Sequence, residues 1–243
     1  MLALMAAAGI FSAATDGQSY GEFLLRWELS RHHRVKYAAI ILDSSPGGSI
    51  EAGTEVHRGS RAVQPLFDAL GNHIGTVSLV SRDRSMNAEA AAIAADISRH
   101  IYSAAGLAEP DPFAPNAVRS TRGQELIERE LRREPSLVTI AFHVALPGSS
   151  NSIVASNFGR IGKAADDDDR RVIATSTVIQ EVTNGGKRLA VELPMLDRSG
   201  HTIGALSTSF TVGAGGQQSA YRSAVRVQKD LSRSIPRAAS LAE

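Results

Sequence analysis

Two copies of one sequence block occur in the chain, and this internal repeat constrains the fold more than any other feature. Residues 65–78 read PLFDALGNHIGTVS and residues 194–207 read PMLDRSGHTIGALS, with six of the fourteen positions identical. The flanking segments match in the same order, with 24–31 corresponding to 126–133 and 96–101 to 230–235. Matched segments in a shared order indicate one module present twice in tandem.

The two copies differ in length. The first matched segment is offset by 102 residues between the copies, the repeated block by 129 and the last segment by 134. The second copy therefore holds 27 additional residues between its first helix and its final hairpin, mostly within 153–190. We expect the copies to have different roles, with a ligand using the extra segment of the second.

Length and composition fit a globular protein of two small domains. The chain has 243 residues, and domains usually contain roughly 100–200 residues. Its 26 basic and 25 acidic residues leave a formal charge of +1, which does not favour a nucleic-acid partner. The absence of cysteine excludes disulfides, thiolate metal sites and a cysteine nucleophile.

The N-terminus resembles an export signal. An apolar run at 2–11 is followed by Ser12, Ala13 and Ala14, small residues of the kind that precede a cleavage site. The run is too short to span a bilayer, which needs about 20 apolar residues. We therefore predict a signal peptide at 1–14 and a secreted, periplasmic protein, with a buried apolar first helix as the alternative.

Periodicity and turn signals predict the same plan in both copies. A first module at 20–103 and a second at 124–236 are joined by a proline-rich linker at 104–123, and a tail covers 237–243. Each module begins with a helix, continues as an antiparallel meander and ends with a helix, which defines an α+β fold. About five strands are expected in each sheet, with fewer in the first. The predicted strands are 35–42, 62–67 and 73–80, then 137–146, 152–156, 176–182, 187–196 and 202–210; the predicted helices are 20–33, one from Asn87, one from a Thr121–Gln124 capping box to about 134, one short helix within 157–176, and 216–235.

In the second copy, the run ASNFGRIGKAADDDD is followed by VIQEV and by KRLAVELPMLDRSGHTIGALSTSF. In this order the segments resemble an extracytoplasmic Cache (PDC-type) sensor domain, which is related to the PAS fold. The resemblance covers 126–236 well and 22–102 more weakly, because the loop and helix are missing from the first copy. It implies two tandem PAS/Cache-like modules and a small-molecule ligand.

Five residues of the second module are candidates for ligand binding. His143 alternates with apolar neighbours in its strand, so it should point away from Phe142 and Val144. Such a histidine lines a pocket, ligates a metal or is a hydrogen-bonded structural residue. Glu192 forms a carboxylate pair with Glu181 across a hairpin, as in acid/base sites, or pairs at the surface with Lys187 or Arg188, which is the reading we favour.

The other three candidates lie in the SNFGRIGK loop. Asn157, Arg160 and Lys163 surround two glycines, and a guanidinium offers a bidentate contact to a carboxylate. The alternative is a surface loop that leads into a helix. The four carboxylates of 166–169 follow, and they are expected to cap that helix rather than to bind calcium.

Taken together, these patterns predict an extracytoplasmic small-molecule-binding protein of sensor type, with no output domain in this sequence. The expected partners are a small molecule, for which a carboxylate-bearing compound is one option, and a second copy or a signalling protein. No cofactor, metal, nucleic acid or membrane-embedded segment is expected. The alternative is a structural or interaction module that has lost its pocket, and an enzyme is disfavoured because no catalytic motif is present.

Overall fold

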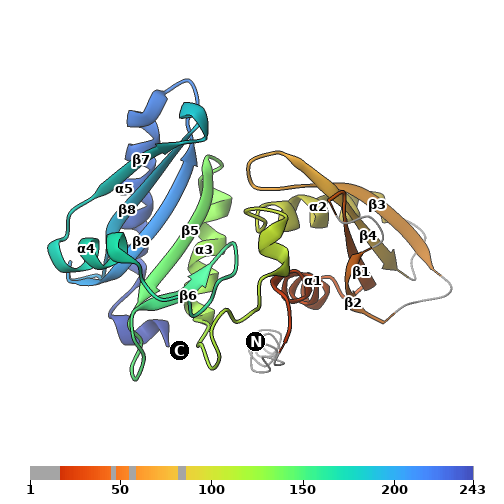
Figure 1. The fold of residues 1–243 in the computed structure, drawn as a ribbon, viewed down its shortest axis with the longest axis horizontal. Coiled ribbons are helices and arrows are strands. Elements are labelled where there is room, and N and C mark those ends of the chain that lie inside the picture. Colours follow the sequence, from red (N-terminus) through yellow and green to blue (C-terminus); the bar gives the residue numbers. More distant parts are fainter. Residues whose placement is uncertain (1–16, 45–47, 55–58, 82–85, 243) are drawn as a thin grey trace. The chain divides into compact units, whose positions relative to one another are not determined.

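A computed structural model describes residues 17–44, 48–54, 59–81 and 86–242. The predicted signal peptide lies outside the described residues. The chain forms two units, Gly17–Asp111 and a second that contains Pro112–Glu243. The described residues form five α-helices and two antiparallel sheets of four and five strands, an α+β architecture consistent with two PAS-like modules (Figure 1).

The first module is a four-stranded sheet with two helices against one face. Its elements are α1 (Tyr20–Arg31), β1 (Val35–Leu42), β2 (Ser49–Gly53), β3 (Ser60–Phe67), β4 (His73–Ser81), α2 (Asn87–Ser98) and the 3₁₀ helix η2 (Ala105–Ala108). The strand order is β2-β1-β4-β3, and every pair is antiparallel. Apolar side chains of both helices and of alternate strand positions form one core, because alternate residues of a strand point to the same face.

The second module repeats this plan with two more elements. It comprises α3 (Thr121–Arg133), β5 (Leu137–Val144), β6 (Ser152–Ser156), α4 (Asp167–Thr175), β7 (Ile179–Thr183), the 3₁₀ helix η3 (Asn184–Gly186), β8 (Arg188–Leu196), β9 (Thr202–Thr211), α5 (Gly216–Ser234) and η4 (Ala238–Leu241). Its strand order is β6-β5-β9-β8-β7. Side chains of α3 and α5 share a core with one face of the sheet, and α4 packs on β8 and β9.

The extra segment predicted for the second module consists mainly of α4 and β7. In the first module, β2 ends at Gly53 and β3 begins at Ser60. In the second, α4 and β7 lie between β6 and β8. The 27 additional residues therefore add a helix and an edge strand to an otherwise shared topology.

Three details differ from the sequence-based expectation. Neither sheet is a simple meander, because the first strand of each module pairs with its last strand. Strand β2 was not predicted, since the Pro-Gly-Gly sequence before it reads as a turn. The helix expected to begin with a Thr121 cap is instead capped by Ser120, whose hydroxyl accepts a hydrogen bond from the backbone N–H of Gly123 at 2.7 Å.

The boundary between the units falls inside the segment predicted as a linker. Leu107 is fully buried in the core of the first module, and the backbone N–H of Tyr20 donates to the carbonyl of Glu109 at 2.8 Å. Beyond the boundary, the backbone N–H of Phe113 donates to Ile161 at 2.8 Å within the second module. Each half of this proline-rich stretch is thus bonded to its own module.

The repeated block forms the same turn in both modules. The carboxylate of Asp68 accepts hydrogen bonds from the N–H groups of Leu70 and Asn72, both at 2.9 Å. Asp197 accepts the equivalent bonds from Ser199 and His201 at 2.8 and 3.0 Å. The identical aspartates therefore preserve the geometry of a hairpin and do not indicate a binding site.

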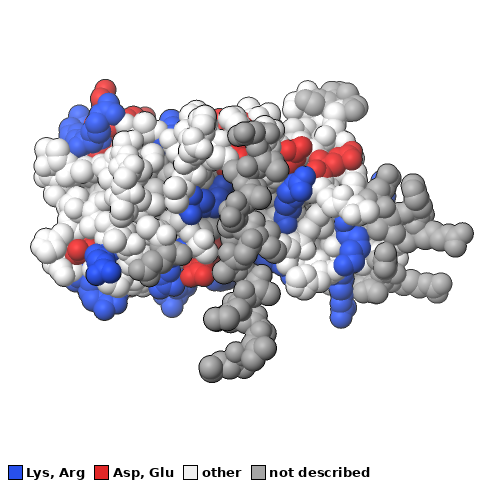
Figure 2. All heavy atoms as spheres, turned by 90° about the horizontal axis from the view of Figure 1, so that it is seen from below, with Lys and Arg blue, Asp and Glu red and all other residues white. Residues whose placement is uncertain are grey.

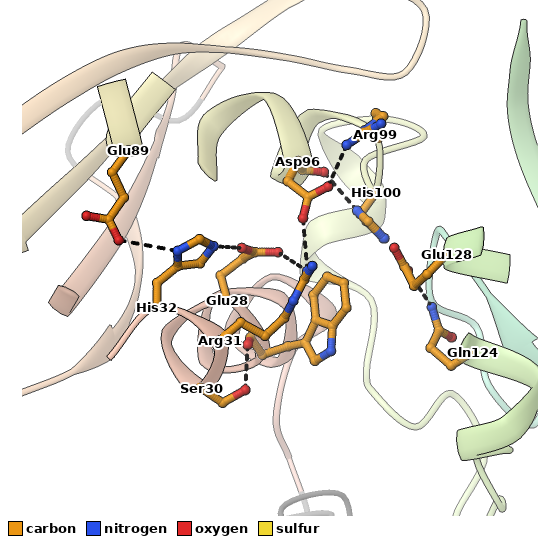
Figure 3. A network of polar contacts seen from close by, with 11 residues as sticks. Glu28, Ser30, Arg31, His32, Glu89, Asp96, Arg99, His100, Gln124 and Glu128 are labelled. Carbon is orange, nitrogen blue, oxygen red and sulfur yellow. Dashed lines mark hydrogen bonds and ion pairs between the residues drawn. The ribbon is translucent and has the colours of Figure 1, made fainter. Parts of the chain in front are cut away.

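A polar network joins the two helices of the first module (Figure 3). The carboxylate of Glu28, 2% exposed, lies 3.3 Å from Arg31, and Arg31 also lies 2.9 Å from Asp96 on α2. His32 connects Glu28 to Glu89 of α2 at 3.5 and 3.4 Å. Carboxylates alternate with Arg31 and His32 in this network, and its contacts link α1 to α2.

Charged side chains do not gather into one extended patch on the face shown in Figure 2, where blue and red groups are scattered among uncharged ones. Among the described residues, none of the helices is both long enough and apolar enough to cross a bilayer.

Candidate functional site

A cluster of polar side chains lies on the face of the five-stranded sheet that is opposite α5. On β5, Phe142 and Val144 point into the main core, so His143 points to the opposite face, as the sequence predicted. On β9 and β8, the same argument places Ser207 and Glu192 on this face, and those two residues are direct cross-strand partners. Three adjacent strands thus present a histidine, a serine and a glutamate to α4.

Asp169 of α4 connects these side chains. Its Oδ2 lies 2.9 Å from Nδ1 of His143, and its Oδ1 accepts a hydrogen bond from the Ser207 hydroxyl at 3.2 Å. Asp169 is 1% exposed and His143 is 7% exposed. The carboxylate is therefore a buried anchor between the helix and two strands.

The start of α4 determines where this carboxylate points. Asp166 is the N-cap residue, and its side chain accepts hydrogen bonds from the N–H groups of Asp168 and Asp169, both at 3.1 Å. In return, Asp169 accepts a bond from the N–H of Asp166 at 3.1 Å. This reciprocal capping box confirms the predicted capping role of the acidic run. It also directs the fourth aspartate toward the sheet.

The pKa of Asp169 is below its ordinary value. Burial acts to raise it, but hydrogen bonding and charge from His143, the backbone N–H of Asp166 and the Ser207 hydroxyl together outweigh burial. Asp169 is therefore ionised near neutral pH. It contributes a buried negative charge to the site.

Glu192 has the opposite behaviour. Burial, followed by the charges of Asp169, Asp166 and Asp168, raises its pKa from 4.5 to about 7, and Arg171 only partly offsets this. Glu192 as a whole is half-buried. Its Oε2 atom is fully buried and has no hydrogen-bond partner among the described residues. The charges that act most on Glu192 are those of the acidic helix start and Arg171, not those of Lys187 or Arg188; the surface pairing that we favoured stays a prediction.

The side-chain amide of Asn157 takes the place of a backbone peptide group in the sheet. Its Oδ1 accepts a hydrogen bond from the N–H of Ile140 and its Nδ2 donates to the carbonyl of Val138, both at 2.9 Å. The residue is 1% exposed. These contacts extend the pairing of β5 beyond the end of β6, which is a structural role that a buried amide can perform well.

Arg160 and Lys163 lie away from Glu192. Their loop runs along β6, where the N–H of Ile153 donates to the carbonyl of Lys163 at 2.9 Å. Strand β6 is separated from β8 by β5 and β9, a span of roughly 14 Å at about 4.8 Å per strand. The structure thus brings His143 and Glu192 together around Asp169 but leaves the two loop cations at the other edge of the sheet.

Sequence reasoning did not identify Asp169 or Ser207 as site residues. Asp169 reads as one of four capping carboxylates, and only the packing of α4 distinguishes it from the exposed Asp167 and Asp168. Ser207 reads as part of a turn block because it is repeated as Ser78. In the first module, the Ser78 hydroxyl is buried without a hydrogen-bond partner among the described residues. Among the described residues of the first module, no carboxylate takes the place of Asp169 beside this hydroxyl.

The first module differs at every other position of the cluster. By strand register, Ile41 corresponds to His143 and Val63 to Glu192. Ile41 is 43% exposed and Val63 is 54% exposed. The polar site is therefore specific to the second module.

No family model matches the chain, and a comparison with curated proteins gives no match.

Proposed function

We propose that the second module binds a small molecule on the sheet face that carries His143, Asp169, Glu192 and Ser207. The observation that supports this proposal best is the grouping of the polar side chains: three adjacent strands present His143, Ser207 and Glu192 on one face, beside the buried carboxylate of Asp169. Glu192 is half-buried, so part of its side chain is open to a ligand.

Binding without catalysis fits the contacts of this cluster. Activation of a serine requires a base that takes its proton. Here the Ser207 hydroxyl donates to Asp169, whose carboxylate also holds His143. Because the group that accepts from the hydroxyl is a carboxylate of lowered pKa, and so a weak base, and not the imidazole, we infer a binding protein rather than an enzyme.

The resemblance to Cache domains extends this proposal to a sensor exported from the cytoplasm. In such a protein, ligand occupancy would be passed to a partner protein or to a second copy. Export has a direct test: N-terminal sequencing of protein from a bacterial periplasm should give Thr15 as the first residue. An intact Met1 would refute the export proposal without affecting the binding site.

A second role, in packing or protein interaction, is favoured for the first module. Its sheet face carries exposed Ile41 and Val63 where the second module carries His143 and Glu192. Apolar residues at both positions remove the polar recognition groups. This observation supports the view that only the second module retains a ligand site.

A thermal-shift screen of the full chain against a metabolite library tests the binding proposal. A ligand present at one hundred times its Kd stabilises the folded state by about 2.7 kcal/mol. A true ligand of the site should stabilise the wild type and should lose most of that effect in Glu192→Gln. Arg160→Ala tests the carboxylate ligand expected from the sequence, since the loss of a buried cation–carboxylate pair costs about 2–5 kcal/mol. If no compound stabilises the protein, or if every hit acts equally on all variants, the proposed site is wrong.

A further inference from the structure

A row of basic side chains runs along the solvent side of α5. Arg222, Arg226, Lys229 and Arg233 follow one another at intervals of four, three and four residues, which places them on one face of a helix. All four are exposed, whereas the opposite face of α5 is buried in the core. The single carboxylate of this helix belongs to Asp230, which is partly buried and lies 3.2 Å from a nitrogen of Arg233. The exposed face of α5 is therefore basic over about three turns.

Helix α3 adds two more cations beside this row. Two contacts join the helices: the Arg129 guanidinium donates to the hydroxyl of the last residue of α5 at 2.9 Å, and Glu134 forms an ion pair with Arg226. Later positions of α3 thus meet earlier positions of α5, so the two helices are antiparallel neighbours. Arg132 and Arg133 are exposed and lie between the two contact points. The cations of α3 consequently extend the basic row sideways onto a second helix.

The carboxylates near these cations are buried or already paired. Glu130 is 2% exposed and Glu134 is 8% exposed, and each forms an ion pair with an arginine. The exposed Glu125 lies near the start of α3, away from the basic row, with a carboxylate oxygen 3.0 Å from Arg122. Four exposed cations of the two helices form no ion pair with any described residue: Arg132, Arg133, Arg222 and Lys229. We call these four residues, together with Arg226 and Arg233, the basic surface.

The basic surface lies on the side of the module away from the candidate ligand site. Helices α3 and α5 share the core on one face of the sheet, whereas Asp169 of α4 meets His143 and Ser207 on the other. In Figure 1 both α3 and α5 lie behind the sheet, so Figure 2, a quarter turn away, shows this side only at its edge. An interaction of the basic surface would therefore leave the ligand site open.

We propose that the basic surface docks the second module onto an anionic phospholipid surface, with its arginine and lysine side chains on the headgroup phosphates. Clusters of four to eight Lys and Arg on a helix are attracted to anionic leaflets, and each charge near the lipid raises the affinity about fivefold, equivalent to about 1 kcal/mol. The surface has six such residues on two adjacent helices. The docking goes beyond the proposed ligand binding and does not depend on it.

The composition of the basic surface favours lipid headgroups over a folded protein partner. Protein interfaces usually depend on a core of aromatic and large apolar side chains. Among the described residues of α3 and α5, the exposed large apolar side chain is Val225 alone, at 37% exposure. Headgroups in a fluid bilayer rearrange around cations and need no such anchor, so charge without apolar contacts is sufficient for them.

The same surface is poorly suited to a single-stranded nucleic acid. Such a strand binds where aromatic side chains stack on its bases beside a basic groove. The two helices contain one aromatic residue, Tyr221, and it is partly buried. Phosphate recognition without stacking is again the chemistry of a lipid surface.

Co-sedimentation of the full chain with vesicles tests the proposal. Vesicles of equal parts phosphatidylglycerol and phosphatidylcholine are compared with vesicles of phosphatidylcholine alone. We expect binding to the anionic vesicles only in about 0.1 M salt. This binding should be lost in about 1 M salt, because the Debye length shortens from about 10 Å to about 3 Å.

Two matched pairs of substitutions locate the contact. Arg222→Gln combined with Lys229→Gln removes two charges from the basic surface and should weaken vesicle binding about 30-fold. Arg170→Gln combined with Lys187→Gln removes the same charge from exposed positions in α4 and after the β7–β8 turn, and should change binding by less than about threefold. Arg132→Gln with Arg133→Gln on α3 gives an independent test, with a loss of similar size, should the α5 variant be misfolded by circular dichroism.

Several outcomes would overturn the proposal. Equal binding to neutral vesicles, or no binding to either kind, would show that anionic headgroups are not recognised. An equal loss in the control pair would show attraction by overall charge and not by this surface. Tighter binding to duplex DNA or to polyglutamate than to the anionic vesicles would assign the surface to another class of macromolecule. None of these results bears on the metabolite screen, so the ligand-binding proposal stands or falls separately.

Discussion

The raised pKa of Glu192 leads to an unusual prediction, namely that the substitution Glu192→Gln stabilises the protein at pH 8. The folded state holds the proton of this carboxyl group up to a pKa of about 7, whereas an unperturbed glutamate has a value of 4.5. Its contribution to stability is therefore fully present below pH 4.5 and is lost as the pH rises through 7. Glutamine resembles the protonated form and cannot lose a proton.

The magnitude follows from the size of the shift. A change from 4.5 to about 7 corresponds to roughly 3 kcal/mol at 1.36 kcal/mol per pKa unit. Because the side chain is partly exposed, solvent screening reduces the expected effect to about 1–2 kcal/mol. The variant and the wild type should thus be equally stable near pH 4, and the variant should be more stable by this amount at pH 8.

Urea denaturation at several pH values between 4 and 8, followed by circular dichroism, measures this difference. The chain's single tryptophan, Trp27, lies in α1 of the first module. Its fluorescence should therefore report an unfolding transition that the substitution leaves unchanged. Glu181→Gln, on the exposed strand β7, should shift neither signal by more than about 0.5 kcal/mol. A variant no more stable than wild type at pH 8, or a Glu192 carboxyl that titrates below pH 5 by NMR, would refute the reasoning.

Three further substitutions test the packing that holds the site. Gly204→Ala should destabilise the second module by about 1–3 kcal/mol in a thermal melt, because the added Cβ would lie 2.1 Å from a backbone oxygen of β5. Gly213→Ala is the control, since no atom lies within 4 Å of a Cβ added there. Asn157→Ala should cost about 1–3 kcal/mol in urea denaturation, since both of its amide atoms bond the backbone of β5, and a loss below about 0.5 kcal/mol would contradict that role. Asp169→Asn should lower the pKa of Glu192 below about 7, because it removes the largest charge acting on that carboxyl. An unchanged NMR titration would show that Asp169 does not contribute to the raised pKa.

The duplicated plan of the chain was readable from the sequence because its signals are local. The alternation of β5 placed His143 opposite Phe142, and the apolar runs located most strands, since a strand's two faces follow directly from residue order. The repeated aspartate turn was equally readable, because its hydrogen bonds join residues at most four positions apart. The difference between 102 and 129 residues in spacing located the added α4 and β7.

Only the tertiary structure decided which polar residues form a site. Asp169 and Glu192 are separated by 23 positions in the chain, and they interact because α4 packs across β8 and β9. The order of the strands placed Arg160 and Lys163 at the β6 edge, although the sequence offered them as ligand-binding candidates together with His143 and Glu192. Sequence determines the chemistry of each side chain and the face on which its strand presents it. Burial and strand order, which arise from contacts between distant segments, determine the charge that each side chain carries and the residues that it meets.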